Sequence, residues 1–108
     1  MLIGRTMRTR HEIEVALDDL GGTVGDVARH LVVSDAGGAR YLPGRCPISR
    51  YLNGRLPTGW TATVSAHVVR VYPWSPWARP VIIPLPDPVA DFVLAFDGHA
   101  YPELERAA

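Results

Sequence analysis

The side chains best suited to recognition chemistry lie in the middle of the chain, where arginines and aromatic residues occur with no carboxylate between Asp35 and Asp87. Residues 36–86 carry six arginines and thus +6, whereas residues 1–35 hold four against six carboxylates (−2) and residues 87–108 hold one against five (−4). All three tryptophans also fall in this middle segment. Arginine and aromatic residues suit nucleic-acid recognition, and they suit protein interfaces almost as well. The pattern predicts a binding surface.

Two stretches are predicted to supply the contacts. A short helix over about 47–54 is expected, because proline is tolerated at the first helical position and Asn53-Gly54 then ends the helix. A loop from Pro73 to Pro80 carries two tryptophans and is stiffened by prolines, so it would lose little entropy on binding. The predicted contact residues are Arg45, Ser49, Arg50, Asn53, Arg55, Trp74, Trp77 and Arg79.

The tryptophans of that loop leave three interpretations open. They could stack on bases, bind a peptide, or fold back as a lid over the core. A lid is favoured, since two tryptophans at the end of a hairpin often close a small domain.

No catalytic constellation can be assembled from the sequence. Cys46 begins a predicted helix, where the helix dipole and Arg45 would lower the pKa of a thiol, but a partly buried structural position is the favoured interpretation. No pair of histidines has the spacing of a metal site, and there is no glycine-rich phosphate loop. The histidines are His11, His30, His67 and His99. We therefore expect a non-enzymatic protein without a metal or cofactor.

Length and composition predict a single globular domain over residues 1–108. The chain is 47% apolar and contains no run of about 18 apolar residues, so no membrane-spanning helix is expected. Its one cysteine cannot form an internal disulfide, which favours a cytoplasmic location.

Hydrophobic periodicity predicts an α+β fold with three N-terminal helices, an antiparallel hairpin and a C-terminal helix. Thr9 and Glu12 form a capping-box pattern at the start of the first helix, and Thr23 is placed to cap the second. The order resembles that of a winged helix-turn-helix without its first strand, with the loop 74–79 as the wing. The predicted helices span about 10–20, 23–33, 47–54 and 87–97, and the strands about 60–72, with a bulge at Val68-Val69, and 79–84.

The apolar stripes of these elements predict the core. Tyr101 and Leu104 are expected to pack back onto it from the C-terminal turn. The predicted core residues are Ile13, Leu17, Leu20, Val27, Leu31, Ile48, Leu52, Val64, Val89, Phe92, Val93 and Phe96.

Residues 23–29, 33–34 and 48–55 resemble parts of the DNA-reading headpiece of LacI-type repressors. That family has a Thr-Val-x-Asp-Val-Ala start, a Val-Ser turn and a Val-Ser-Arg-x-Leu-Asn-Gly recognition helix. The resemblance implies that Ser49, Arg50 and Asn53 contact base edges. The spacing departs from the family, because about a dozen residues separate the two helices where a helix-turn-helix has three or four.

A second resemblance covers about residues 24–104. The stretches 46–52 and 92–104 are similar to small actinobacterial proteins that share a Cys-Pro-x-x-x-Tyr-Leu helix and a Phe-Asp-x-x-x-Tyr-Pro-Glu-Leu ending. This resemblance implies no particular activity.

The sequence thus favours a nucleic-acid-binding module that uses segment 36–86. The alternative is a protein-interaction module or homodimeric accessory protein, in which the basic middle faces an acidic surface such as the tail 87–108 of its own or a second copy. An unpaired arginine face would favour the first hypothesis. Pairing of the arginines with Asp91, Asp97 or Glu103 would favour the second.

Overall fold

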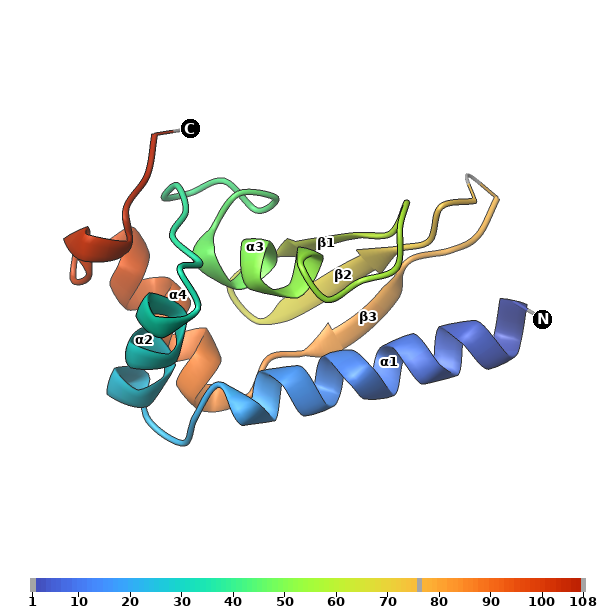
Figure 1. Ribbon diagram of the computed structural model, residues 1–108, viewed down its shortest axis with the longest axis horizontal. Coiled ribbons are helices and arrows are strands. Elements are labelled where there is room, and N and C mark those ends of the chain that lie inside the picture. The colour runs from blue at the N-terminus through green and yellow to red at the C-terminus, as the bar shows by residue number, and fades with distance from the viewer. Residues whose placement is uncertain (1, 76, 108) are drawn as a thin grey trace.

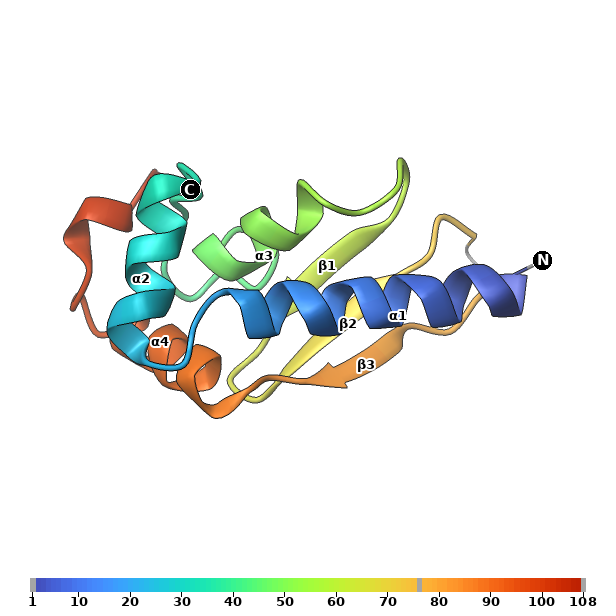
Figure 2. The same ribbon diagram turned by 60° about the horizontal axis from the view of Figure 1, so that its bottom comes forward.

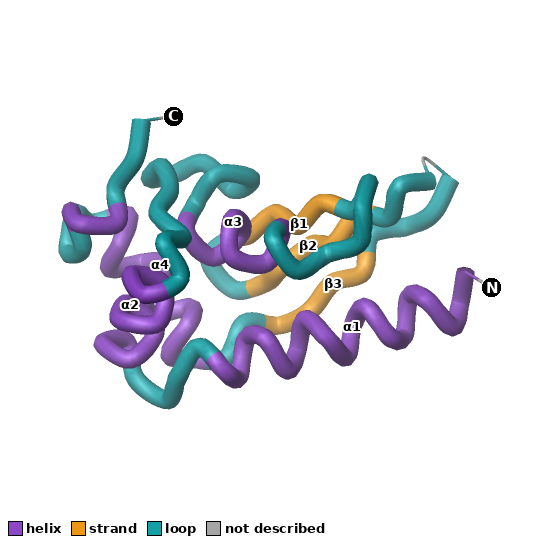
Figure 3. Tube along the Cα trace, viewed as in Figure 1, coloured by secondary structure: helices purple, strands orange, loops and turns teal. Residues whose placement is uncertain are grey.

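A computed structural model describes residues 2–75 and 77–107, with side chains from Arg8 onward, as an α+β structure (Figure 1). Its long first helix and its sheet lie side by side, α2 and α4 lie at one end of the sheet, and α3 lies over β1 (Figure 3). The elements are α1 (Leu2–Asp19), α2 (Val24–Val33), α3 (Pro47–Asn53), β1 (Thr61–Val64), β2 (Val68–Tyr72), β3 (Val81–Pro84), α4 (Asp87–Asp97) and a 3-10 turn (Pro102–Leu104).

The three strands form an antiparallel sheet in the order β1-β2-β3. Both α1 and α3 lie across the same face of this sheet, with α1 along β3 and α3 against β1 (Figure 2). The residues that point toward these helices are buried, and the alternate residues on the opposite face are exposed or half-buried. The buried set is Ala62, Val64, Val69, Val71 and Ile83.

The first helix begins earlier than predicted. It starts at Leu2, and Thr9 is buried within it instead of capping its first turn, so the capping-box interpretation is wrong. Apart from Gly4, residues 2–9 contain no helix breaker, and the leucine, methionine and arginine among them propagate a helix well. The cap predicted for α2 is confirmed, because the Thr23 hydroxyl accepts a hydrogen bond from the Asp26 amide at 3.1 Å.

The predicted strand over 60–72 is in fact two strands joined by a tight turn over residues 65–67. The Ser65 amide donates to the Val68 carbonyl at 3.0 Å, and Val64 lies opposite Val69. The break in alternation at Val68 marks this turn, and the predicted bulge is wrong. The next strand, β3, pairs only with β2 in the described sheet. An edge position suits its last residue, Pro84, because proline has no amide hydrogen to donate to a further strand.

All twelve predicted core residues are buried. The ring of Phe92 stacks on that of Phe96 at 5.9 Å and lies 5.3 Å from the ring of Tyr101. Leu104 is also buried, so the predicted packing of the C-terminal turn is confirmed. The core therefore joins α2, α4 and the C-terminal turn to the covered face of the sheet.

Candidate nucleic-acid interface

Helix α3 is fixed at its start by local hydrogen bonds. The Cys46 sulfur accepts from the Ser49 amide at 3.4 Å, and the Ser49 hydroxyl donates to the Cys46 carbonyl at 2.9 Å. Ser49 is fully buried, so the prediction that it points outward to contact a ligand is wrong. A helix of seven residues that packs against both β1 and α2 leaves little of its surface free.

The Asn53 side chain joins the end of α3 to the outer edge of β1. Its amide nitrogen donates to the Ala62 carbonyl at 3.2 Å, and its oxygen accepts from the Ala62 amide at 2.7 Å. The Asn53 side chain thus forms the two hydrogen bonds to Ala62 that a neighbouring strand would form at this edge of the sheet. This double bond to the backbone contradicts the expectation that Asn53 is free to contact a base.

Two arginines of the α3 region do remain on the surface. Arg50 and Arg55 are exposed, and the Arg55 guanidinium lies 4.1 Å from the centre of the Tyr51 ring. Both arginines border a shallow hollow of about 380 Å³ beside the loop 34–37, which also carries the exposed Asp35. The Tyr51 hydroxyl of α3 lies 3.3 Å from His30 Nε2 of α2, within hydrogen-bond distance. The winged-helix arrangement of these helices stays a prediction.

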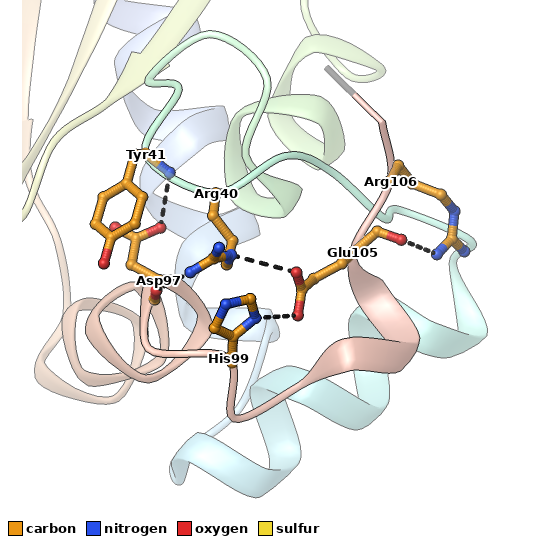
Figure 4. Close-up of polar contacts among 6 residues, drawn as sticks. All are labelled: Arg40, Tyr41, Asp97, His99, Glu105 and Arg106. Carbon is orange, nitrogen blue, oxygen red and sulfur yellow. Dashed lines mark hydrogen bonds and ion pairs between the residues drawn. The ribbon is translucent and has the colours of Figure 1, made fainter.

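The first arginine of the acid-free segment is bound to the C-terminal tail (Figure 4). Arg40 forms an ion pair with Glu105 at 3.2 Å and donates to the Asp97 carbonyl at 2.8 Å. The Asp97 carboxylate accepts from the Tyr41 amide at 3.0 Å. Both partners of the ion pair are about three-quarters buried, and so Arg40 serves to hold the tail against the loop that precedes α3.

The lid interpretation of the tryptophan loop is wrong. Trp74 is 61% exposed and Trp77 is 92% exposed, whereas Trp60 is buried in the core. The loop that leads to Trp60 packs closely on the tryptophan loop, since a Cβ atom on Gly59 would lie 2.9 Å from Trp74 Cβ. The two loop tryptophans are therefore presented to solvent by a loop that packs against Gly59. Arg79 is exposed beside them, and Arg45 is exposed in the loop before α3.

The open face of the sheet is the part of the surface that the sequence did not single out. Arg70 lies in register with Thr63 on β1 and Ile82 on β3, and Tyr72 lies opposite Thr61. Tyr72 is 41% exposed and Ile82 is 48% exposed. The sequence did contain an indication of this face, because Arg70, Tyr72 and Trp74 occupy alternate positions and so point to the same side of an extended strand.

The alternation of β2 continues beyond its last residue. Val71 and Pro73 are buried, whereas Tyr72 and Trp74 are exposed. The open face therefore leads directly into the tryptophan loop. We call the two together the sheet surface, which comprises Thr61, Thr63, Arg70, Tyr72, Ile82, Trp74, Trp77 and Arg79.

No carboxylate belongs to the sheet surface, because residues 36–86 contain none. In the described part of the chain, five of the six arginines of that segment form no ion pair. Arg70 donates only a long hydrogen bond, to the Ser65 hydroxyl at 3.4 Å. The guanidinium groups of Arg70 and Arg79 therefore give this surface an uncompensated positive charge.

The Cys46 thiol is a structural group. Burial raises its pKa, and this effect outweighs the hydrogen bonds from Ser49 that would lower it. A reactive thiolate is not favoured in such an environment. Among the described residues, no group of three or more metal-ligating side chains lies close enough to hold an ion, and no helix is long and apolar enough to cross a membrane.

No protein-family model, curated protein or solved structure matches the chain. The resemblances to LacI-type headpieces and to the small actinobacterial proteins thus stay predictions. Inference about function rests on the sheet surface and on the contacts of the arginines.

Proposed function

We propose that this protein is a non-enzymatic module that binds single-stranded nucleic acid on its sheet surface. The observation that carries the proposal is the placement of the half-buried Arg70 and the exposed Tyr72 on an acid-free sheet face that continues into Trp74 and Trp77. Aromatic rings on an open sheet offer stacking positions for unpaired bases, and guanidinium groups offer contacts to phosphates. The single buried cysteine is in keeping with a cytoplasmic location for this activity.

Single-stranded ligands fit better than a duplex. Reading a duplex through α3 would require side chains that reach base edges in the major groove. Ser49 is buried, and Asn53 is bonded to Ala62, so only Arg50 and Arg55 of that helical region extend into solvent. Stacking on Tyr72 and the tryptophans needs no such helix.

The proposal is tested by fluorescence anisotropy with a labelled 20-nucleotide single strand and the matching duplex. We expect the single strand to bind more tightly. Tyr72→Ala should weaken binding by roughly five- to a hundredfold, because stacking of one base contributes about 1–3 kcal/mol. Trp77→Ala should have an effect of similar order if its ring stacks as well.

Tyr41→Ala is the matched control, because Tyr41 is 69% exposed but belongs to the loop before α3. It should leave the affinity within about twofold of the wild type, and melting temperatures should show that both variants are folded. Equal losses for Tyr72→Ala and Tyr41→Ala would contradict the assignment of the sheet surface. Absence of salt-sensitive binding at micromolar protein would contradict the function itself.

A protein-interaction module is the second candidate, and the Arg40–Glu105 pair favours it. This pair shows that the acidic tail can neutralise part of the basic segment. If no nucleic acid binds, the exposed tryptophans become the first surface to test for a partner. A Trp74→Ala, Trp77→Ala double variant should then change the elution volume of any homodimer in size-exclusion chromatography.

A further inference from the structure

A hollow of about 470 Å³ lies between the loop 41–46, the turn 65–67 and α4. None of its lining residues belongs to the sheet surface, although Arg70 of that surface donates to Ser65 of the turn. The volume of the hollow falls within the range of about 300–1,000 Å³ that is typical of small-molecule sites. Most of its lining side chains are apolar. Three of the larger ones are exposed to solvent: Tyr41 (69% exposed), Leu42 (38%) and Leu94 (74%).

One wall is a second stripe along α4. Val89, Phe92 and Phe96 form the stripe that enters the core. Ala90, Val93, Leu94 and Asp97 follow the spacing i, i+3, i+4, i+7 and line the hollow, and Val93 among them is also buried in the core. Helix α4 therefore presents a partly apolar face that the described elements do not cover over Leu94.

Two carboxylates, Asp91 and Asp97, line the hollow together with the imidazole of His67. Asp91 is exposed on α4 and forms no ion pair with a described residue, and Asp97 lies at the end of the same helix. No arginine lines the hollow. Arg40 does contact Asp97, but its guanidinium donates to the backbone carbonyl of that residue and forms its ion pair with Glu105.

We infer that this hollow binds a small organic amine with an apolar body. The body would lie against Leu42, Val93 and Leu94, and the ammonium group would lie beside Asp91 at the rim. An acid of the same shape would meet two carboxylates, with no arginine and only the His67 imidazole to offset them. The inference does not depend on nucleic-acid binding, since it uses another part of the surface and the opposite charge.

The experiment uses three probes that share an indole body and differ in charge: tryptamine (positive), 3-ethylindole (neutral) and indole-3-propionate (negative). Each is titrated into the full ¹⁵N-labelled chain, and amide shifts are followed by NMR. Tryptamine should bind with a dissociation constant on the order of 1 mM, as expected for about twelve non-hydrogen atoms. The largest shifts should fall in residues 41–43, 65–67 and 90–97.

Two variants separate the charge from the apolar wall. Asp91→Asn should weaken tryptamine binding roughly two- to fivefold, as expected for an exposed ion pair, and leave 3-ethylindole unchanged. Leu94→Arg should abolish binding of tryptamine, and its fold should persist because Leu94 is mostly exposed. Retained dispersion of the amide spectrum and an unchanged melting temperature would verify that fold.

Three outcomes would overturn the inference. One is binding of indole-3-propionate as tight as that of tryptamine, and another is a set of shifts outside the three named segments. The third is a concentration-dependent dimer of the wild type that Leu94→Arg dissociates, which would assign the hollow to a second copy of the chain. Oligonucleotide binding should be unaffected by Leu94→Arg in every case, so failure here leaves the proposed function standing.

Discussion

Asn53→Ala is the substitution that most directly separates a structural role from a binding role. Asn53 makes two hydrogen bonds to the backbone of Ala62, at 3.2 Å and 2.7 Å, and Ala62 is fully buried. Alanine at position 53 would leave both backbone groups without their partner at the edge of β1. We therefore expect a large loss of stability and no specific loss of binding.

The size of the effect follows from these two groups. A buried polar group that loses its partner costs about 1–3 kcal/mol. The site is only part-buried, so water replaces some of the loss, and alanine gains about 0.5 kcal/mol in helix propensity. The net expectation is about 2–3 kcal/mol of unfolding free energy. For a chain of this size, this corresponds to a fall in melting temperature of at least about 8 °C.

The measurement is urea unfolding followed by circular dichroism, with two comparison variants. Asn53→Asp keeps an acceptor for the Ala62 amide but sets a carboxylate against the Ala62 carbonyl, so it should lose about as much stability as Asn53→Ala. Arg50→Ala lies on the same helix but is exposed, and it should stay within about 0.5 kcal/mol of the wild type.

The reasoning fails if Asn53→Ala unfolds at the urea concentration of the wild type. It fails equally if Asn53→Ala weakens oligonucleotide binding more than tenfold while the stability is unchanged. That second result would return Asn53 to the role of a base contact that the LacI-type resemblance implies.

Further substitutions test the caps and the buried thiol. Because burial raises the pKa of the Cys46 thiol in the folded state, the unfolded thiol ionises first, so unfolding free energy should fall as the pH rises above about 8.5. Cys46→Ser keeps an N-cap acceptor and should remove this alkaline loss in urea unfolding at pH 7.5 and pH 10. The wild-type thiol should react with Ellman's reagent only at the rate of unfolding. Thr23→Ala should lower stability by about 1 kcal/mol through loss of the α2 cap, as measured by thermal unfolding, whereas Thr58→Ala in an exposed turn should not.

The core could be predicted from the sequence because each of its helical stripes extends over two turns or more. Ile13, Leu17 and Leu20 fix the buried side of α1, and Val89, Phe92 and Phe96 fix that of α4. Periodicity over such a length admits one solution for the buried face.

The buried face of α3 could be predicted only in part, because Ile48 and Leu52 are buried as expected but Ser49 is not exposed. With seven residues α3 completes barely two turns, and neighbours on both sides bury Pro47, Ile48, Ser49, Tyr51 and Leu52. Polarity alone suggested that Ser49 faces solvent, but its hydroxyl is satisfied by the Cys46 carbonyl. A polar residue near the start of a helix can bond back to its own backbone and be buried at little cost.

The sheet surface was missed for a related reason. The turn over residues 65–67 contains no glycine, proline or asparagine, and Ser65, its one residue that is common in turns, is too weak a signal to separate it from a bulge. Without the turn, Arg70 and Tyr72 could not be assigned to a face. The sequence likewise did not indicate that Trp74 and Trp77 stay outside the core.

The acid-free segment carries +6, but the structure does not present that charge as one patch. Arg40 is paired with Glu105, and Arg50 and Arg55 belong to the α3 region on the covered side of the sheet. Only Arg70 and Arg79 belong to the sheet surface. If a single strand binds there, each phosphate contacted should contribute a slope of about −0.7 to the dependence of log affinity on log salt. Two arginines then give a slope of about −1.4, whereas engagement of the whole segment would give about −4. The salt dependence therefore gives the number of arginines used, but Arg50 and Arg55 together would give the same slope as Arg70 and Arg79. The loss of affinity in Tyr72→Ala is what identifies the face that binds.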